Sequence, residues 1–120
     1  MRWKTKGSRS TKYGNRKTTV DGIEFDSRKE AARWLELRLL QRTGEISGLQ
    51  RQVVFELVPK SRDPFGHYVP PVTYKADFTY FEKGKLVVED VKSDATRKLP
   101  EYRIKKKLMW FFRKLWIKEV

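Results

Sequence analysis

Two neighbouring segments near the middle of the chain carry acidic residues at positions where a β-strand normally holds other residue types. Asp77 lies within Thr73 to Phe81, while Asp90 and Lys92 lie within Leu86 to Lys92, and these segments are the clearest candidates for a pair of strands. Asp is a poor strand former, so both acidic positions oppose the local preference. Positions that oppose local rules are often functional. We therefore ask first what two carboxylates and an ammonium group do together.

A tight hairpin would bring these three side chains to one place. The connecting segment Glu82 to Lys85 contains Gly84, which can supply the positive φ that a tight turn needs. A loop of two residues and a loop of four residues give the same register, and this register sets Asp77 opposite Asp90. Because side chains alternate between the faces of a strand, Lys92 is expected on the same face, with Cβ separations of about 5 Å.

Two opposed carboxylates repel each other unless a cation lies between them. Mg²⁺, with Mn²⁺ as a substitute, suits a site of oxygen ligands that leaves room for water and a phosphate. The alternative is that these are charges that solvate an edge strand. Glu89 is adjacent to Asp90 but is expected to face the other way, alongside Val87 and Val91. We predict that Glu89 is a structural ion-pair partner rather than a metal ligand.

Three other features have structural as well as functional interpretations. Glu30 follows Ser27 by three residues and completes a capping box, so the sequence alone leaves open whether it caps a helix or binds a ligand. The only histidine, His67, lies in a loop rich in proline and glycine, and a surface role is predicted for it. Four aromatic residues near the C-terminus occur at helical spacing and are predicted to belong to the core rather than to a base-stacking platform: Trp110, Phe111, Phe112 and Trp116.

The net charge of +13 arises from 28 Lys and Arg against 15 Asp and Glu. Such an imbalance points to a polyanionic partner, and nucleic acid is the leading candidate. An acidic membrane surface is the other candidate, but the apolar runs fall well short of the roughly 20 residues that span a bilayer, and no signal peptide is recognised. The absence of cysteine excludes disulfides and thiolate metal sites, which fits a cytoplasmic protein.

Residues 1–17 are predicted to be a flexible basic arm because they hold no acidic and few apolar side chains. Residues 18–120 are predicted to form a single folded domain, consistent with 38% hydrophobic and 13% aromatic residues. The basic residues of the arm and of the outer face of the last helix are expected to hold phosphates. These predicted DNA contacts are Lys4, Lys6, Arg9, Lys12, Arg16, Lys17, Lys98, Lys105 and Lys106, with Arg2 also in the arm.

The remaining elements follow from turn and capping signals. Asp21-Gly22 predicts a type I′ hairpin between Thr18 and Phe25, and a capping residue and Gly44 delimit a helix from Arg28 to Thr43. A strand is predicted at Val53 to Val58 and a loop at Lys60 to Pro71. A helix is predicted to begin near Pro100, with an apolar stripe of Ile104, Leu108, Phe111 and Leu115. A final strand is predicted at Trp116 to Val120. The order is helix, three strands, helix, strand.

This order and several motifs resemble the PD-(D/E)xK nuclease superfamily, whose common core is αβββαβ. The motif segments are YKADFTY, with Asp77, and VVEDVKS, with Asp90 and Lys92. More narrowly, KYGNRKTTVDGIEFDSRKEA, GEI and LQRQVVFEL resemble a phage family known as a domain of unknown function and placed near phage endonuclease I, a Holliday-junction resolvase. The similarity covers roughly residues 12–120, and one departure from the superfamily pattern is Ala76, which stands where proline often precedes the first Asp.

The resemblance implies an α/β (α+β) restriction-endonuclease-like core, in which a mixed sheet is flanked by two helices. It also implies that Asp77 and Asp90 bind the metal together with the main-chain carbonyl of Val91, and that Lys92 positions or activates the attacking water. Glu30 matches a glutamate that many superfamily members contribute from the first helix as a further ligand.

The expected function is a Mg²⁺-dependent endonuclease that hydrolyses DNA by in-line attack of water, leaving a 5′-phosphate and a 3′-hydroxyl. The resemblance further implies branched DNA as substrate, a homodimer, and a role in phage DNA recombination within the host cytoplasm. The alternative is a non-catalytic basic nucleic-acid-binding protein, which explains the charge but leaves Asp77 opposite Asp90 unexplained. A third possibility is a subunit that cuts only within a larger complex.

Overall fold

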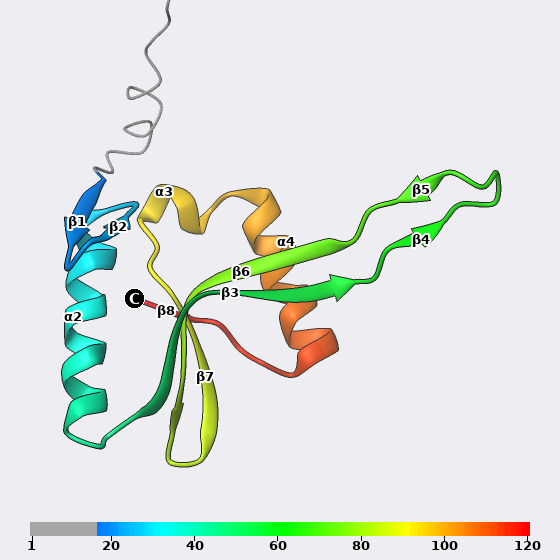
Figure 1. Cartoon of the computed structure of the whole chain (residues 1–120). Coiled ribbons are helices and arrows are strands. Elements are labelled where there is room, and N and C mark those ends of the chain that lie inside the picture. Colours follow the sequence, from blue (N-terminus) through cyan, green and yellow to red (C-terminus); the bar gives the residue numbers. More distant parts are fainter. Residues whose placement is uncertain (1–16) are drawn as a thin grey trace, which may run out of the picture.

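The computed structural model of the chain describes residues 17–120 (Figure 1). Most of the predicted basic arm therefore lies outside the described residues, including Arg2, Lys4, Lys6, Arg9, Lys12 and Arg16. Lys17 is described: its Nζ atom lies 3.3 Å from the Asp26 Oδ1 atom, and both side chains are exposed.

The first elements follow the predicted signals. Strands β1 (Thr18–Val20) and β2 (Ile23–Phe25) pair around Asp21-Gly22, whose φ angles of 51° and 78° are those of a type I′ turn. Helix α2 (Arg28–Arg42) begins where the Ser27 side chain accepts the Glu30 backbone N–H. The hairpin and the helix are confirmed.

The main sheet of the described residues has four strands in the order β3, β6, β7, β8. Strand β3 (Ser47–Val58) is antiparallel to β6 (Val72–Glu82), β6 is antiparallel to β7 (Lys85–Asp90), and β7 is parallel to β8 (Lys118–Glu119). The predicted α+β class with a mixed sheet is confirmed. Strand β3 begins six residues before the predicted strand, and the final strand is shorter than predicted.

Beyond the body of the molecule, β3 and β6 continue into a projecting two-stranded ribbon (Figure 1). The prediction of a plain loop at Lys60 to Pro71 is wrong, because β4 (Ser61–Arg62) pairs with β5 (Tyr68–Val69) near its tip. The Asp63 Oδ1 atom accepts the backbone N–H groups of Phe65 and His67, which fixes the turn. His67 lies on the surface as predicted, with Asp63 as a partner at 3.3 Å.

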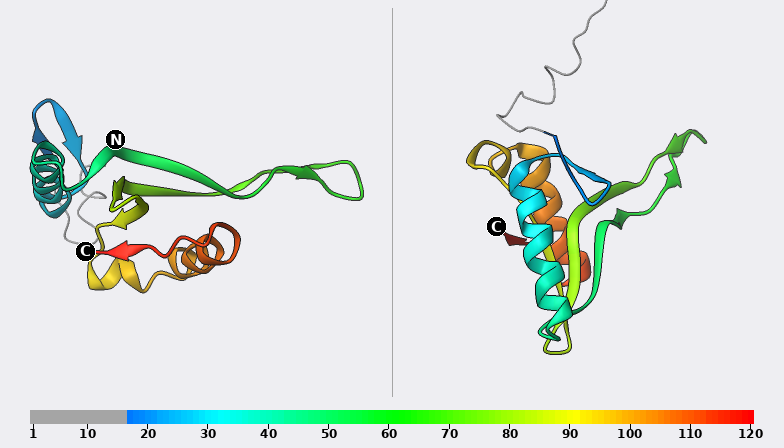
Figure 2. Two further views of the ribbon diagram at one scale, coloured as in Figure 1. Left: turned by 90° about the horizontal axis from the view of Figure 1, so that it is seen from below. Right: turned by 60° about the vertical axis from the view of Figure 1, so that its left-hand side comes forward.

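Helices cover both faces of the sheet (Figure 2). After β7 come the short helix α3 (Asp94–Arg97), helix α4 (Pro100–Leu108) and the π-helical turn η1 (Met109–Arg113). One apolar cluster lies on the α2 side, namely Phe25, Ala31, Leu37, Ile46, Phe78 and Tyr80; a second lies on the α4 side, namely Leu57, Tyr74, Ala76, Val88, Tyr102, Met109 and Ile117. No helix in the described part of the chain is long and apolar enough to cross a membrane.

Strand β6 changes the helix it packs against part-way along its length. Phe78 and Tyr80 belong to the cluster on the α2 side, whereas Tyr74 and Ala76, which have the same parity along the strand, belong to the cluster on the α4 side. Asp77 lies at the point of change. The twist of strand β6 thus places Asp77 between the two apolar clusters rather than within either of them.

The predicted apolar stripe of the last helix is present only in part: Leu108 and Leu115 pack against the core, but Ile104 and Phe111 do not. Tyr102 and Met109 are buried, whereas Ile104 is 58% and Phe111 is 66% exposed. The four C-terminal aromatic residues predicted for the core, Trp110, Phe111, Phe112 and Trp116, are all exposed. The helix is therefore rotated about its axis relative to the orientation that its apolar residues predict.

Polar contacts with β8 explain this rotation. The Tyr102 hydroxyl and the Lys106 ammonium both donate to the Glu119 Oε2 atom, at 2.6 and 3.0 Å. The π-helical turn then changes the angular spacing of the residues that follow. Lys106, predicted to point outward, thus faces the sheet.

Candidate active site

The hairpin of β6 and β7 has the predicted register. Its ladder runs from Glu82 paired with Lys85 to Phe78 paired with Glu89. The loop has two residues, Lys83 and Gly84, whose φ angles of 52° and 77° again define a type I′ turn. Local turn chemistry alone is therefore sufficient to set the register.

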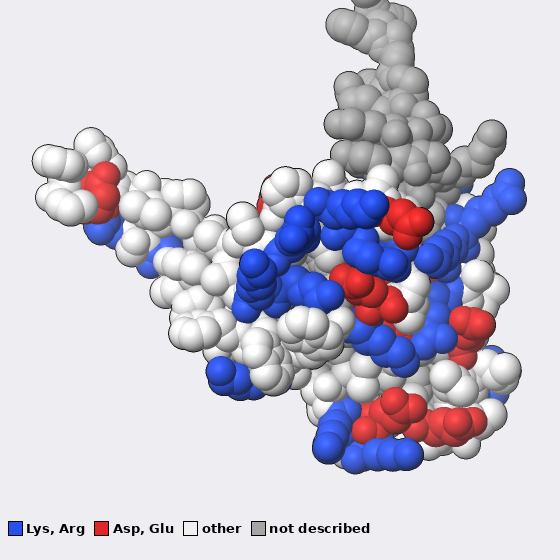
Figure 3. Space-filling model, turned by 180° about the vertical axis from the view of Figure 1, so that it is seen from behind, with Lys and Arg blue, Asp and Glu red and all other residues white. Residues whose placement is uncertain are grey.

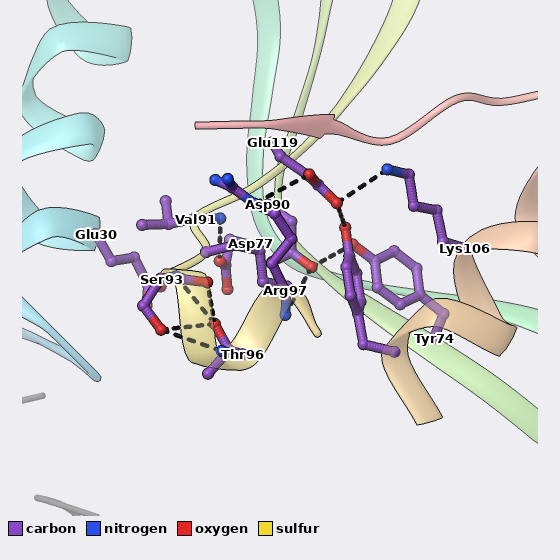
Figure 4. Close-up of polar contacts among 12 residues, drawn as sticks. Glu30, Tyr74, Asp77, Asp90, Val91, Ser93, Thr96, Arg97, Lys106 and Glu119 are labelled. Atoms are coloured by element: carbon purple, nitrogen blue, oxygen red, sulfur yellow. Dashed lines mark hydrogen bonds and ion pairs between the residues drawn. The ribbon is translucent and has the colours of Figure 1, made fainter. Parts of the chain in front are cut away.

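The next position of this register is Asp77 and Asp90, but these residues do not form a ladder pair. The ladder ends one pair earlier, and the Asp77 Oδ2 atom accepts the backbone N–H of Val91 at 2.9 Å. The predicted juxtaposition of the two carboxyl groups is nevertheless present, because both line the same pocket and the neighbouring Asp90 raises the pKa of Asp77. Figure 4 shows both groups beside the start of α3.

Asp90 is 3% exposed and is held by one partner on the neighbouring strand and one two residues further along the chain. The Tyr74 hydroxyl donates to its Oδ2 atom at 2.6 Å, and the Lys92 Nζ atom lies 3.3 Å from the same oxygen. Burial, and then the negative charge of Asp90, raise the pKa of Tyr74 well above its usual range, so this hydroxyl remains a donor. The Lys92 ammonium also lies 4.1 Å from the centre of the Tyr102 ring. As predicted, Asp90 and Lys92 share one face.

Asp77 retains its proton far above the usual range of a carboxyl group. Burial, the hydrogen bond to Asp90, and the charges of Asp90 and Glu30 raise the pKa of Asp77 to about 8, against the lowering effect of the Val91 amide. Two carboxyl groups share a hydrogen bond only when one of them carries a proton. The raised pKa of Asp77 indicates that this pair of acids resists carrying two negative charges at once.

Glu30 is buried and its carboxyl group faces the site. The first half of the capping box is present, because the Ser27 side chain accepts the Glu30 backbone N–H at 3.1 Å. Among the described residues, however, the donor that binds the carboxylate is the Gln52 side chain rather than the Ser27 amide. Burial, followed by the charge of Asp26, raises the pKa of Glu30.

Gln52 is a site residue that sequence reasoning missed. Its Nε2 atom lies 3.3 Å from Glu30 Oε2 and 3.4 Å from Asp77 Oδ1, so the amide group bridges the two acids. Its φ of 53° is left-handed, and the β3–β6 ladder omits this residue. A left-handed conformation costs a non-glycine residue roughly 1 to 2 kcal/mol, a strain typical of functional positions. A glutamine in a polar stretch of strand gives no sequence signal of this role.

The acidic residues open onto two adjoining pockets of about 220 and 350 Å³, which share Lys75, Asp90 and Lys92. The first pocket is also lined by Lys29 and the second by Lys105. On one face of the molecule, acidic side chains are bordered by Lys and Arg (Figure 3). Cations around buried acids would allow an anionic group to approach the carboxylates.

The predicted phosphate contacts have different surroundings in the structure. Lys17 and Lys98 are exposed, and Lys105 lines the second pocket while pairing with Glu101 at 2.9 Å. Lys106 is not on the outer face, because it reaches Glu119. Lys75, which was not predicted, has no ion pair within residues 17–120 and lies between the pockets.

Glu89 has the structural role predicted for it. It is fully buried on the α2 side, where Arg33 binds both carboxylate oxygens at 2.8 and 2.6 Å and Tyr80 donates a further hydrogen bond. Such a bidentate pair leaves the carboxylate few free acceptor positions.

The three predicted acidic ligands do not form a single cluster. Within residues 17–120, no group of three or more His, Asp or Glu side chains is close enough to hold a metal ion. Asp77 and Asp90 lie side by side (Figure 4). The Gln52 amide links Glu30 to Asp77. Val91 lines the first pocket beside them. The site thus has two neighbouring carboxyl groups, Asp77 and Asp90. The third, Glu30, is separated from Asp77 by the Gln52 side chain.

Comparison with known families adds one finding. A family model described as Protein of unknown function (DUF1064) matches residues 10–118. The chain belongs to this family. No curated protein and no solved structure matches it. The matched region of this DUF1064 chain contains every residue of the two pockets.

Proposed function

We propose that this chain is a metal-dependent endonuclease of the PD-(D/E)xK type that hydrolyses phosphodiester bonds of DNA. The observation that carries the proposal is the contact between Asp77 and Asp90 beside the Lys92 ammonium, in a pocket bordered by cations. The order α2, β3, β6, β7, α4, β8 is compatible with the αβββαβ core of that superfamily, with β4, β5 and α3 as additions.

The donor set fits a magnesium ion. Mg²⁺ is commonly bound through one or two carboxylates, with waters and substrate phosphate oxygens filling the other positions, so a cage of three acids is not required. The raised pKa of Asp77 supports the same assignment, because a divalent cation can take the place of the retained proton. When bound by Asp77 and Asp90, Mg²⁺ or Mn²⁺ would lower the pKa of the attacking water and neutralise charge on the phosphate.

The protein side chains have separate roles in this proposal. Lys92 supplies a positive charge beside the reacting phosphate and orients the nucleophile. Tyr74 fixes the Asp90 carboxylate, and Gln52 holds Glu30 beside Asp77, where it would help to hold the cation. Lys75, exposed between the pockets, binds a phosphate oxygen of the substrate.

The resemblance to phage endonuclease I supports a narrower version of the proposal. It suggests branched DNA as the substrate, as for a Holliday-junction resolvase in phage recombination. Resolution of a four-way junction needs two coordinated cuts, and therefore suggests a homodimer. Cleavage of labelled junctions, flaps and plain duplexes by the same preparation would identify the preferred substrate.

Magnesium-dependent nicking of a supercoiled plasmid tests the activity itself. Asp77→Asn, Asp90→Asn and Lys92→Ala should each abolish nicking while leaving DNA binding largely intact. Asp94→Asn is the matched control, because this exposed residue lies four positions from Asp90 and outside the site. Nicking that survives in Asp90→Asn would refute the site assignment. Tight DNA binding without nicking by the wild type would favour the non-catalytic alternative.

A further inference from the structure

The C-terminal end of the last helix carries an exposed group of aromatic rings. Trp110, Phe111, Phe112 and Trp116 are 49%, 66%, 53% and 61% exposed. The two tryptophans meet edge to face with ring centres 5.9 Å apart, and the two phenylalanines do so at 5.0 Å. In an edge-to-face pair, the ring that contributes its edge keeps its own faces free for another planar group.

Positive charge surrounds these rings. Residues 103–118 contain seven Lys and Arg and no Asp or Glu. The Lys114 Nζ atom lies 5.8 Å from the centre of the Trp110 ring and 5.4 Å from that of Phe111. Lys106, whose ammonium is paired with Glu119, lies 4.8 Å from the centre of the Trp116 ring. The backbone conformation at Lys114 is left-handed, with φ of 57°, and ends the π-helical turn. The exposed rings and the cations thus form one surface.

We propose that this aromatic–basic surface, defined by Trp110, Phe111, Phe112, Lys114 and Trp116, binds single-stranded nucleic acid. Proteins that bind single strands combine a cationic track for the backbone with aromatic rings on which unpaired bases stack. Duplex DNA keeps its bases stacked and offers no free base faces to these rings. A second copy of the chain is a poor occupant, because the same cationic surface would face itself.

The location of this surface connects it to the candidate active site. Tyr102, on the same helix, contacts Lys92, and Phe112 lies ten residues further along the chain. Ten helical residues span about 15 Å, the length of a few extended nucleotides. A single strand bound on the aromatic–basic surface would therefore be long enough to pass Lys105, which lines the second pocket, and enter the pockets. The inference rests on the proposed function in taking nucleic acid as the substrate, and it adds that the substrate has an unpaired segment.

The test measures binding in EDTA, where cleavage cannot occur, so that its outcome does not depend on the proposed activity. The full chain is titrated into fluorescently labelled (dT)20 and, separately, into a 20-base-pair duplex. Phe111→Ala and Phe112→Ala keep every charge and remove one stacking ring each. Each should weaken (dT)20 binding by about 5- to 150-fold, the range for loss of one base–aromatic stack, with little effect on the duplex.

Two further variants separate stacking from other effects. Phe65→Ala is the matched control, because Phe65 is 83% exposed at the tip of the projecting ribbon and outside this surface; it should bind (dT)20 like the wild type. Trp110→Phe keeps a ring and should retain binding, whereas Trp110→Ala should lose it. Lys114→Gln should make the slope of log K against log salt shallower by about 0.7, the value for one single-strand phosphate contact.

Three results would overturn the inference. Equal losses for (dT)20 and the duplex in Phe111→Ala would show that the ring does not act by stacking on unpaired bases, and a thermal melt of the variant shows whether the loss comes from unfolding. Binding to vesicles rich in anionic lipid, lost in Phe111→Ala while (dT)20 binding persists, would assign the rings to a membrane surface. Self-association in sedimentation that disappears in Phe111→Ala, without a change in (dT)20 binding, would assign them to a second copy of the chain.

Discussion

The raised pKa of Asp77 makes a definite prediction about stability in the absence of metal. An acid whose pKa is higher in the folded state than in the unfolded state stabilises the fold fully below the unfolded value, and this contribution is lost as the pH rises through the folded value. For Asp77 these values are 3.8 and about 8. The wild type should therefore lose stability steadily from about pH 4 to pH 8.

The magnitude follows from proton linkage. In this window the folded state holds one proton more than the unfolded state, so stability should fall by up to about 1.4 kcal/mol per pH unit. Over the whole window the loss in the free energy of unfolding is at most about 6 kcal/mol. Coupling of the Asp77 proton to Asp90 lowers this value. Asp77→Asn cannot ionise, and its amide oxygen can still accept the Val91 N–H. The variant should therefore lose this part of the pH dependence.

Urea denaturation in EDTA at several pH values between 5 and 9 measures the difference directly. The free energy of unfolding of the wild type should fall relative to Asp77→Asn up to about pH 8 and run parallel to it above that. Glu30 also has a raised pKa and is present in both proteins, so only its coupling to Asp77 enters the difference. Asp94→Asn, an exposed control, should follow the wild type. Parallel curves for the wild type and Asp77→Asn throughout would refute the assignment of the retained proton.

Metal binding should reverse the effect. Mg²⁺ at 100 times its dissociation constant should stabilise the wild type by about 2.7 kcal/mol at pH 9, and should stabilise Asp77→Asn much less. At pH 5 the gain should be smaller, since the metal must displace the proton. A thermal melt with and without Mg²⁺ at the two pH values provides this comparison, and equal shifts in both proteins would contradict a site at Asp77.

Three further predictions concern the surroundings of the site. Glu30→Gln should lose most cleavage if the carboxylate helps to hold the cation, whereas wild-type rates would return Glu30 to a purely structural role. Tyr74→Phe should lower stability by about 1.5 to 3 kcal/mol through loss of the hydrogen bond to Asp90 and should shift the pH profile of cleavage, with the exposed Tyr68→Phe as control. Deletion of residues 1–12 should leave the melting temperature nearly unchanged and make the salt slope of duplex binding shallower by at most about 4 to 5; an unchanged slope would show that these residues do not contact DNA.

The parts of the site that could be predicted are those that local rules determine. The Lys83-Gly84 turn permits only one close pairing of the flanking strands, so the register of Asp90 and Lys92 follows from a few residues. The first helix could be delimited because Ser27 caps it and Gly44 ends it. Alternation along β7 was also sufficient to separate Asp90 from Glu89.

Features that depend on contacts between distant segments could not be predicted. The rotation of α4 depends on Glu119 of β8, which accepts hydrogen bonds from the Tyr102 hydroxyl and the Lys106 ammonium. The spacing of apolar residues within the helix does not indicate that Glu119 is a partner. The bridging position of Gln52 depends on a left-handed residue inside a strand, a conformation that strand preferences do not predict for glutamine. In both cases a polar interaction across the fold overrides the local pattern.

Glu89 and Asp90 are similarly buried but differ in the partners that compensate their charge. They are adjacent, are 0% and 3% exposed, and face opposite sides of the same strand. Arg33 binds Glu89 through two hydrogen bonds, so its charge is already compensated and a further cation would gain little. Asp90 has Lys92 as its cation but must also accommodate Asp77, and the pair keeps a proton instead of a second charge. On the side of Asp90, the two neighbouring acids open onto a pocket that Lys29, Lys75 and Lys92 also line, and their uncompensated charge is what the proposed metal ion would balance.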